Sequence, residues 1–262
     1  MNNIFNIKRM GWLSRWIIST DMKYYRKSAA TSFAIIIFIM LMPNLNYVMG
    51  GKMDIEFSAG AMFWVLGVCV LVGGGYMMYS YSQWKDGLRE LPLLPASNLE
   101  KFLMRYLYSL LSQLVIIIGS ILIADLLQYV VGWVIGRPDL KFVTPMICDM
   151  MGRFMNESAK GGGLLLTIGL WIHTIFMLGA NFFRNLKFSW LFTSLFLIIL
   201  FIVGARVLIS CHVIEGGGQL IQFLESHYLL ATCLFLVLSV INAWLAYKLF
   251  CRRQLVGRFI NY

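Results

Sequence analysis

The sequence predicts an all-α polytopic membrane protein with six transmembrane helices and an N-terminal interfacial amphipathic helix. Its 262 residues are 60% hydrophobic and only 13% charged, and the mean hydropathy is +0.75. No single soluble core of this size can bury so much apolar surface. Five cysteines in so long a chain exclude a secreted disulfide scaffold, and 15% aromatic residues exclude intrinsic disorder.

We expect the chain to divide into three parts. Residues 1–28 form a cytoplasmic amphipathic segment, residues 29–250 the six-helix transmembrane domain, and residues 251–262 a cytoplasmic tail. In the first part, Ile, Met and Trp side chains are interspersed with Lys8, Arg9 and Arg15. This pattern is typical of a helix that lies at the inner membrane surface, with its basic residues toward anionic lipid.

Six stretches are long enough to cross the hydrocarbon of a bilayer, which takes about 20 mostly apolar residues. They are Ala29 to Val48, Phe57 to Tyr81, Phe102 to Val131, Leu164 to Phe182, Phe188 to Ser210 and Tyr228 to Phe250. The polar, basic residues before them lack a compact apolar run and a small-residue cleavage site. The first span is therefore expected to be uncleaved.

The basic residues predict the topology. Six spans place both termini on one side, and the segments on that side hold 16 of the 22 Lys and Arg residues. The opposite loops hold five, and Arg206 falls within a span. The positive-inside rule then places both termini in the cytoplasm. The net charge of +10 is thus a topology signal, and nucleic acid is not an expected partner.

The cytoplasmic loop of residues 83–101 joins the second span to the third. Pro92 and Pro95 interrupt it and leave room for a short helix over Trp84 to Leu91. Ser97 and Glu100 have the S-x-x-E spacing of a capping box, which starts the third helix before its membrane portion. Two interpretations are open: a rigid docking surface, or simply a well-made turn between two spans.

The outer loop of residues 132–163 contains a second amphipathic pattern. Thr144 is a suitable N-cap, Pro145 fits the first helical position, and apolar residues recur at helical spacing from Met146 to Phe154. These features predict a short external amphipathic helix that ends at the glycine run 161–163.

Four polar residues lie within predicted spans, where ionisable groups are costly and are usually paired or functional. Asp125 and Arg206 reach similar depths near the outer surface, and either they form an ion pair or each extends to water. His173 and Asn242 lie near the middle of the fourth and sixth spans. Each of these two either lines an internal path or forms an interhelical hydrogen bond.

The motifs of catalysis are missing from the sequence. No G-x-x-x-x-G-K-[ST] motif occurs, so the chain has no P-loop for ATP. The three histidines are isolated, and neither H-x-x-x-H nor C-x-x-C spacing predicts a metal site. Neither a G-x-S-x-G nucleophile nor facing intramembrane acids are found. We therefore expect no catalytic residues, no metal and no cofactor in this chain.

Three motifs carry a resemblance to a known family. They are LRELPLLPASNLEKFLMRYL after the second span, LGANFFRNLKF after the fourth and YKLFCRRQL at the end of the sixth. With six spans and a basic N-terminus, the chain resembles, over nearly its whole length, bacterial permease subunits of the type-2 ABC exporter family. The most specific element is LPASNLEKF, from Leu94 to Phe102.

The resemblance implies that a coupling helix around Trp84 to Leu94 docks into a cleft of a separate ATPase subunit, which holds ATP and Mg. The implied coupling residues are Trp84, Lys85, Asp86, Leu88, Arg89, Glu90, Leu91 and Leu93. It also implies a second permease subunit, in a homodimer or heterodimer, and a location in the bacterial inner membrane. The apolar interior favours export of a hydrophobic or amphipathic substrate.

Two other classes remain open. A secondary transporter is expected to show an internal repeat and interrupted helices with charge at the midplane. We find neither a midplane acid nor a repeat between residues 1–131 and 132–262. A non-transporting membrane scaffold or accessory protein would share the topology but bind no ATPase. A neighbouring reading frame that encodes a P-loop ATPase without spans would favour the permease over both.

Overall fold

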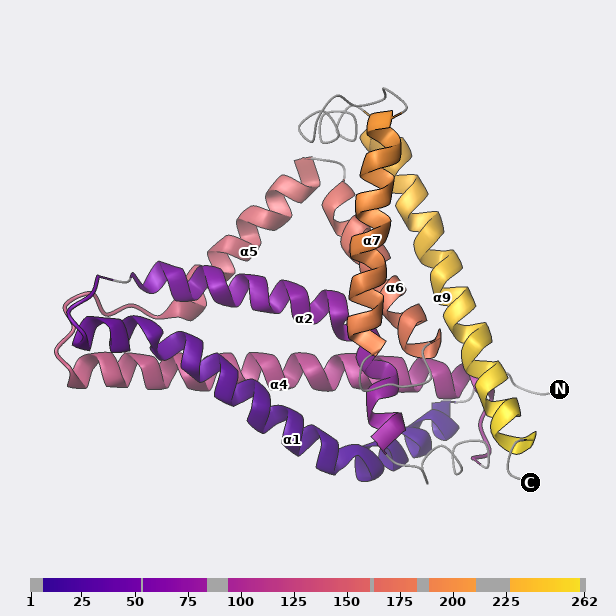
Figure 1. The fold of residues 1–262 in the computed structure, drawn as a ribbon. Coiled ribbons are helices and arrows are strands. Elements are labelled where there is room, and N and C mark those ends of the chain that lie inside the picture. Colours follow the sequence, from indigo (N-terminus) through magenta and orange to yellow (C-terminus); the bar gives the residue numbers. More distant parts are fainter. Residues whose placement is uncertain are drawn as a thin grey trace. The chain divides into compact units, whose positions relative to one another are not determined.

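A computed structural model describes residues 7–52, 54–83, 94–160, 163–182, 189–210 and 227–259 (Figure 1). All the regular secondary structure in these ranges is helical. The helices are α1 (Ile7–Val48), α2 (Ile55–Gln83), α4 (Asn98–Val134), α5 (Val143–Lys160), α6 (Leu164–Phe182), α7 (Ser189–Ser210) and α9 (Tyr228–Phe259).

Five of these helices contain stretches long and apolar enough to cross a membrane. They are Tyr25–Val48, Ile55–Gly73, Asn98–Val134, Leu164–Phe182 and Tyr228–Arg252. In α7, the apolar stretch found among the described residues, Leu191–Gly204, is shorter. The predicted class, an all-helical polytopic membrane protein, is therefore confirmed, whereas the sixth span stays a prediction.

Helix α1 continues without a break from the predicted N-terminal segment into the first span. The sequence from Trp12 to Met42 contains neither Pro nor Gly, so nothing in it terminates a helix. Pro43 lies near the end of the helix. The location of the first turns at a membrane surface stays a prediction.

The chain forms two compact units, which we describe separately. The α5 unit comprises Ser14–Val70 and Leu107–Asn156, and the α9 unit comprises Met1–Leu13, Leu71–Tyr106 and Glu157–Tyr262. Several helices contribute residues to both units, α4 being divided after Tyr106.

Apolar residues of α1, α2, α4 and α5 form the core of the α5 unit. The buried members of this core are Ile36, Met40, Ile55, Ala59, Met62, Ile117, Ile121, Ala124, Val143 and Ile147. Helix α5 is thus part of the packed core along one side, because Val143 and Ile147 lie four residues apart on one helical face.

In the α9 unit, α6 packs along α9, as the two neighbouring ribbons in Figure 1 show. The ring of Trp171 on α6 lies 5.2 Å from that of Phe235 on α9. Helix α6 also contacts α7, and a methyl group at Gly179 would overlap the hydroxyl of Thr193. The glycine therefore permits this close approach of α7 to α6.

The six-span topology predicts that the residue after Val48 and the C-terminus lie on opposite sides of the membrane. We expect reporter fusions placed after Val48 and after Tyr262 to give opposite signals, with the C-terminal fusion cytoplasmic. Five spans would put Tyr262 on the side opposite the N-terminus, so equal signals at the two fusion sites would contradict six spans.

Candidate functional site

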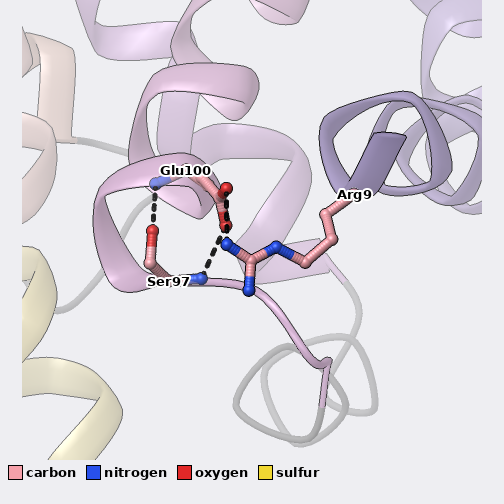
Figure 2. A network of polar contacts seen from close by, with 3 residues as sticks. All are labelled: Arg9, Ser97 and Glu100. Atoms are coloured by element: carbon pink, nitrogen blue, oxygen red, sulfur yellow. Dashed lines mark hydrogen bonds and ion pairs between the residues drawn. The ribbon is translucent and has the colours of Figure 1, made fainter. Parts of the chain in front are cut away.

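The start of α4 is capped by its own side chains (Figure 2). The backbone N–H of Ser97 donates to Oε2 of Glu100 at 2.8 Å, and the backbone N–H of Glu100 donates to Oγ of Ser97 at 3.2 Å. These two bonds are the reciprocal pair of a capping box, as the S-x-x-E spacing predicts. The first turn of α4 is therefore fixed directly after the proline-containing loop.

The same carboxylate binds a residue from the N-terminal end of the chain. The guanidinium Nη2 of Arg9 on α1 donates to Oε1 of Glu100 at 3.2 Å, forming an ion pair across 91 positions of sequence. The Glu100 side chain is fully buried, whereas that of Arg9 is 39% exposed. Figure 2 shows Glu100 between Arg9 and Ser97, so one carboxylate joins α1 to the cap of α4.

We call the three residues joined by these contacts, Arg9, Ser97 and Glu100, the clamp; further buried charged and aromatic side chains follow it in the first turns of α4. Lys101 and Arg105, in the first turns of α4, are also buried. Between them, Phe102 places its ring 5.5 Å from that of Tyr247 and 5.4 Å from that of Phe250, both on α9. The start of α4 is thus held to α1 by an ion pair and to α9 by aromatic packing.

The eight predicted coupling residues, from Trp84 to Leu93, lie outside the described residues. The next described residue is Leu94, three positions before Ser97. The clamp formed by Arg9, Ser97 and Glu100 therefore follows the predicted docking segment almost immediately in the chain.

The two polar residues predicted in the fourth and sixth spans both lie close to polar atoms of neighbouring helices. His173 on α6 is buried, and its Nε2 lies 2.8 Å from the hydroxyl of Tyr106 on α4. Nδ2 of Asn242 on α9 lies 3.5 Å from Oγ1 of Thr174 on α6. Of the two interpretations, these contacts favour interhelical hydrogen bonds, which connect α4, α6 and α9.

Asp125 does not extend to water, because its side chain is buried. Its Oδ1 accepts from the backbone N–H of Val143 and its Oδ2 from that of Thr144, both at 2.8 Å. The carboxylate thus caps α5 from a different helix, replacing the N-cap role predicted for Thr144. Arg206 lies in α7 with an exposed side chain, and its ion pair with Asp125 stays a prediction.

A network of buried polar residues in the α5 unit was not anticipated from the sequence. Asn44 donates through Nδ2 to the carbonyl of Gln128 at 2.8 Å and accepts at Oδ1 from Nη1 of Arg137 at 3.0 Å. Nε2 of Gln128 donates to the carbonyl of Lys141 at 2.9 Å. The available signal was the presence of Asn44 and Gln128 in otherwise apolar runs, where buried polar groups need partners.

The cap provided by Asp125 can be tested directly. Replacing Asp125 with Ala leaves two buried N–H groups of α5 without acceptors, which costs about 1–3 kcal/mol. We expect the purified protein to unfold about 5 °C lower in a thermal melt. Asp139→Ala is the control, because it removes an exposed acid from the nearby linker between α4 and α5. Equal melting temperatures for the two variants would contradict the assigned role.

Among the described residues, no group of three His, Cys, Asp or Glu side chains is arranged to hold a metal ion. The described fold is that of the polytopic membrane protein class, with long apolar helices and buried polar contacts between them. No family model, no curated protein and no solved structure matches the chain.

Proposed function

We propose that the chain is the membrane-spanning permease subunit of an ATP-driven exporter of the type-2 ABC family. A separate ATPase subunit binds ATP and Mg, and its hydrolysis drives export of a hydrophobic or amphipathic substrate. A second permease subunit, identical or related, completes the export path. The complex lies in the bacterial inner membrane, with both termini of this chain in the cytoplasm.

The observation that carries this proposal is the clamped start of α4. An ATP-driven exporter whose membrane subunit has no P-loop must receive its energy from a partner subunit, and a rigid connection transmits a partner's movement better than a slack one. Glu100 accepts hydrogen bonds from Ser97 and Arg9 at the first turn of a 37-residue helix. A displacement that reaches Ser97 therefore acts on α4 through the hydrogen bonds of its first turn.

The contacts of α4 within the α9 unit provide a continuation for such a movement. Tyr106, nine positions after Ser97, lies at hydrogen-bond distance from His173 on α6. Phe102 contacts Tyr247 and Phe250 on α9. A shift of the first turns of α4 would thus act on α6 and α9 together, and these are two of the helices of membrane-spanning length.

The decisive experiment is co-expression of the full chain with the P-loop ATPase encoded nearest to its own reading frame. We expect the two proteins to co-purify in detergent and to hydrolyse ATP faster after reconstitution into lipid nanodiscs than the ATPase does alone. Failure to co-purify, with the chain folded, would favour the scaffold or accessory class. Ion-driven transport without ATP would instead favour a secondary transporter.

A further inference from the structure

The chain after α4 folds back along the same helix before α5 begins. The backbone N–H of Arg137 donates to the carbonyl of Gly132 at 3.0 Å. The next contacts lie progressively earlier in α4: Lys141 bonds to Gln128, and Val143 bonds to Asp125. Asp125 precedes the end of α4 at Val134 by nine residues, or about 13 Å along the helix axis. Helix α5 therefore begins beside Asp125, about 13 Å back along α4 from its C-terminal end.

Side chains of α5 contact α2 at two levels. Val143 and Ile147 share a buried cluster with Ile55 and Ala59, at the start of α2. Further along, the ring of Phe154 lies 5.9 Å from that of Phe63. Phe63 is eight residues into α2, which is about 12 Å along its axis. The two helices therefore occupy the same range of depth.

A contact with α1 places the starts of α2 and α5 beside an apolar stretch of membrane-spanning length. The hydroxyl of Ser58, in the first turn of α2, donates to the carbonyl of Ile39 at 3.1 Å. Ile39 lies nine residues before the end of α1 at Val48, within the stretch Tyr25–Val48 that is apolar enough to cross a membrane. The start of α2, and with it α5, thus packs beside the middle of that stretch.

Exposed apolar residues at the C-terminal ends of α1 and α4 indicate that the membrane surface lies near these two ends. Trp133 and Val134 are 71% and 70% exposed, and Val48 and Met49 are also exposed. Apolar side chains with so much exposed surface at the ends of long apolar helices belong in lipid or at its interface. With hydrocarbon about 30 Å thick, a start about 13 Å below these ends places α5 deep in the outer half of the bilayer.

One side of α5 is incompatible with hydrocarbon at that depth. Asp149 and Arg153 are four residues apart on one face with Asn156, and all three side chains are exposed in the α5 unit. An ionised side chain in the middle of a bilayer costs about 3 kcal/mol or more. Non-spanning segments at membrane depth are tolerated where they are buried in protein or line a water-filled cavity.

We propose that α5 lies within the bilayer beside α2 and forms one wall of a water-filled vestibule. Asp149, Arg153 and Asn156 face the water of this vestibule. Met151 and Met155, exposed on an adjacent face, contact acyl chains. The vestibule opens to the side of the membrane on which α1 and α4 end. The inference goes beyond the proposed export function. It holds equally for a permease or a scaffold, because it rests on contacts within the α5 unit and on the exposed apolar ends of α1 and α4.

The test is spin-label accessibility on the full chain, reconstituted into vesicles of phosphatidylethanolamine and phosphatidylglycerol. Single cysteines replace Asp149, Arg153, Met151 or Met155 in a background without the native cysteines. Each nitroxide is measured with oxygen, which concentrates in hydrocarbon, and with a water-soluble nickel chelate. Labels at Leu122, an exposed apolar residue of α4, and at Lys52, an exposed residue between α1 and α2, give the lipid and water references.

We expect labels at positions 149 and 153 to respond to the nickel chelate as strongly as the label at Lys52. Labels at 151 and 155 should respond to oxygen as the label at Leu122 does, at a depth about 10 Å or more below a label at Val48. Nickel accessibility at all four positions would show that α5 lies outside the membrane, and nickel protection at 149 and 153 would exclude the vestibule. The measurement needs neither ATP nor an ATPase, so its failure is distinguishable from failure of the proposed function.

Discussion

Truncating Leu88 and Leu91 to Ala together is expected to reduce co-purification of the ATPase subunit at least tenfold and to abolish ATP-driven transport. The two leucines are the aliphatic side chains of the predicted short helix that ends before Pro92 and Pro95. Small interfaces depend on a few central apolar side chains. The loss of about 1–2 kcal/mol at each of two such positions exceeds the 1.4 kcal/mol that corresponds to a tenfold change in Kd.

A charge reversal tests the rim of the same segment. Arg89→Glu should weaken the interaction with the ATPase and lower the salt dependence of its association, because rim charges act mainly on encounter. The measurements are pull-down of the ATPase and its hydrolysis rate in nanodiscs, with and without the permease variant.

Leu229→Ala is the matched control for the two leucines, since Leu229 is an exposed apolar residue at the start of α9. The variants of the coupling segment should insert and fold as the original chain does, because this segment lies outside the predicted spans. Leu229→Ala should do so too, because it shortens an exposed side chain. If the Leu88/Leu91 double variant retained full coupling, the segment would be an ordinary turn, and the scaffold interpretation would gain support.

Breaking the clamp at the start of α4 is expected to give the second largest effect. Glu100→Ala removes the hydrogen bonds to Ser97 and Arg9 from a fully buried position. The expected loss in free energy of unfolding is about 2–3 kcal/mol, since bonds to charged groups contribute more than neutral ones and Arg9 is partly solvated. Thermal unfolding of the purified protein measures this loss.

Variants of the partners separate the cap from the ion pair. Ser97→Ala removes one capping bond and costs about 1 kcal/mol, whereas Arg9→Ala removes the ion pair and leaves both capping bonds in place. The Arg9→Ala and Glu100→Ala substitutions should be non-additive in a double-mutant cycle by about 1 kcal/mol or more, because each removes the same contact.

Arg15→Ala controls for the loss of a basic residue from α1, since Arg15 is exposed on the same helix. Additive effects of Arg9→Ala and Glu100→Ala would contradict the clamp. If the clamp also serves the proposed function, Arg9→Ala should leave ATPase binding intact and yet lower transport per ATP hydrolysed. A purely structural role would alter stability and leave this ratio unchanged.

The sequence by itself determined those features that depend on composition or on neighbours three or four positions apart. Apolar runs of about 20 residues predict membrane-spanning helices, because the length needed to cross hydrocarbon is fixed by the helical rise. The capping box of Ser97 and Glu100 was predictable for the same reason: both bonds join positions within one turn. Thr144 and Pro145 likewise marked the start of α5, although the acceptor that caps it came from elsewhere.

Only the tertiary structure decided which distant residues meet. Arg9 and Glu100 are 91 positions apart, and Tyr106 and His173 are 67 apart. Asp125 caps α5 across 18 and 19 positions, whereas its placement near the end of an apolar run left an ion pair and exposure to solvent open. In the α5 unit, the contacts Asp125–Val143 and Phe63–Phe154 fix the register of α5 against α4 and α2, which amphipathicity leaves undetermined. The physical reason is that hydropathy fixes only how far each helix extends along its axis. The register and rotation of one helix against another follow from side-chain packing and from the need of buried polar groups for partners. Packing and partner choice depend on the whole chain at once.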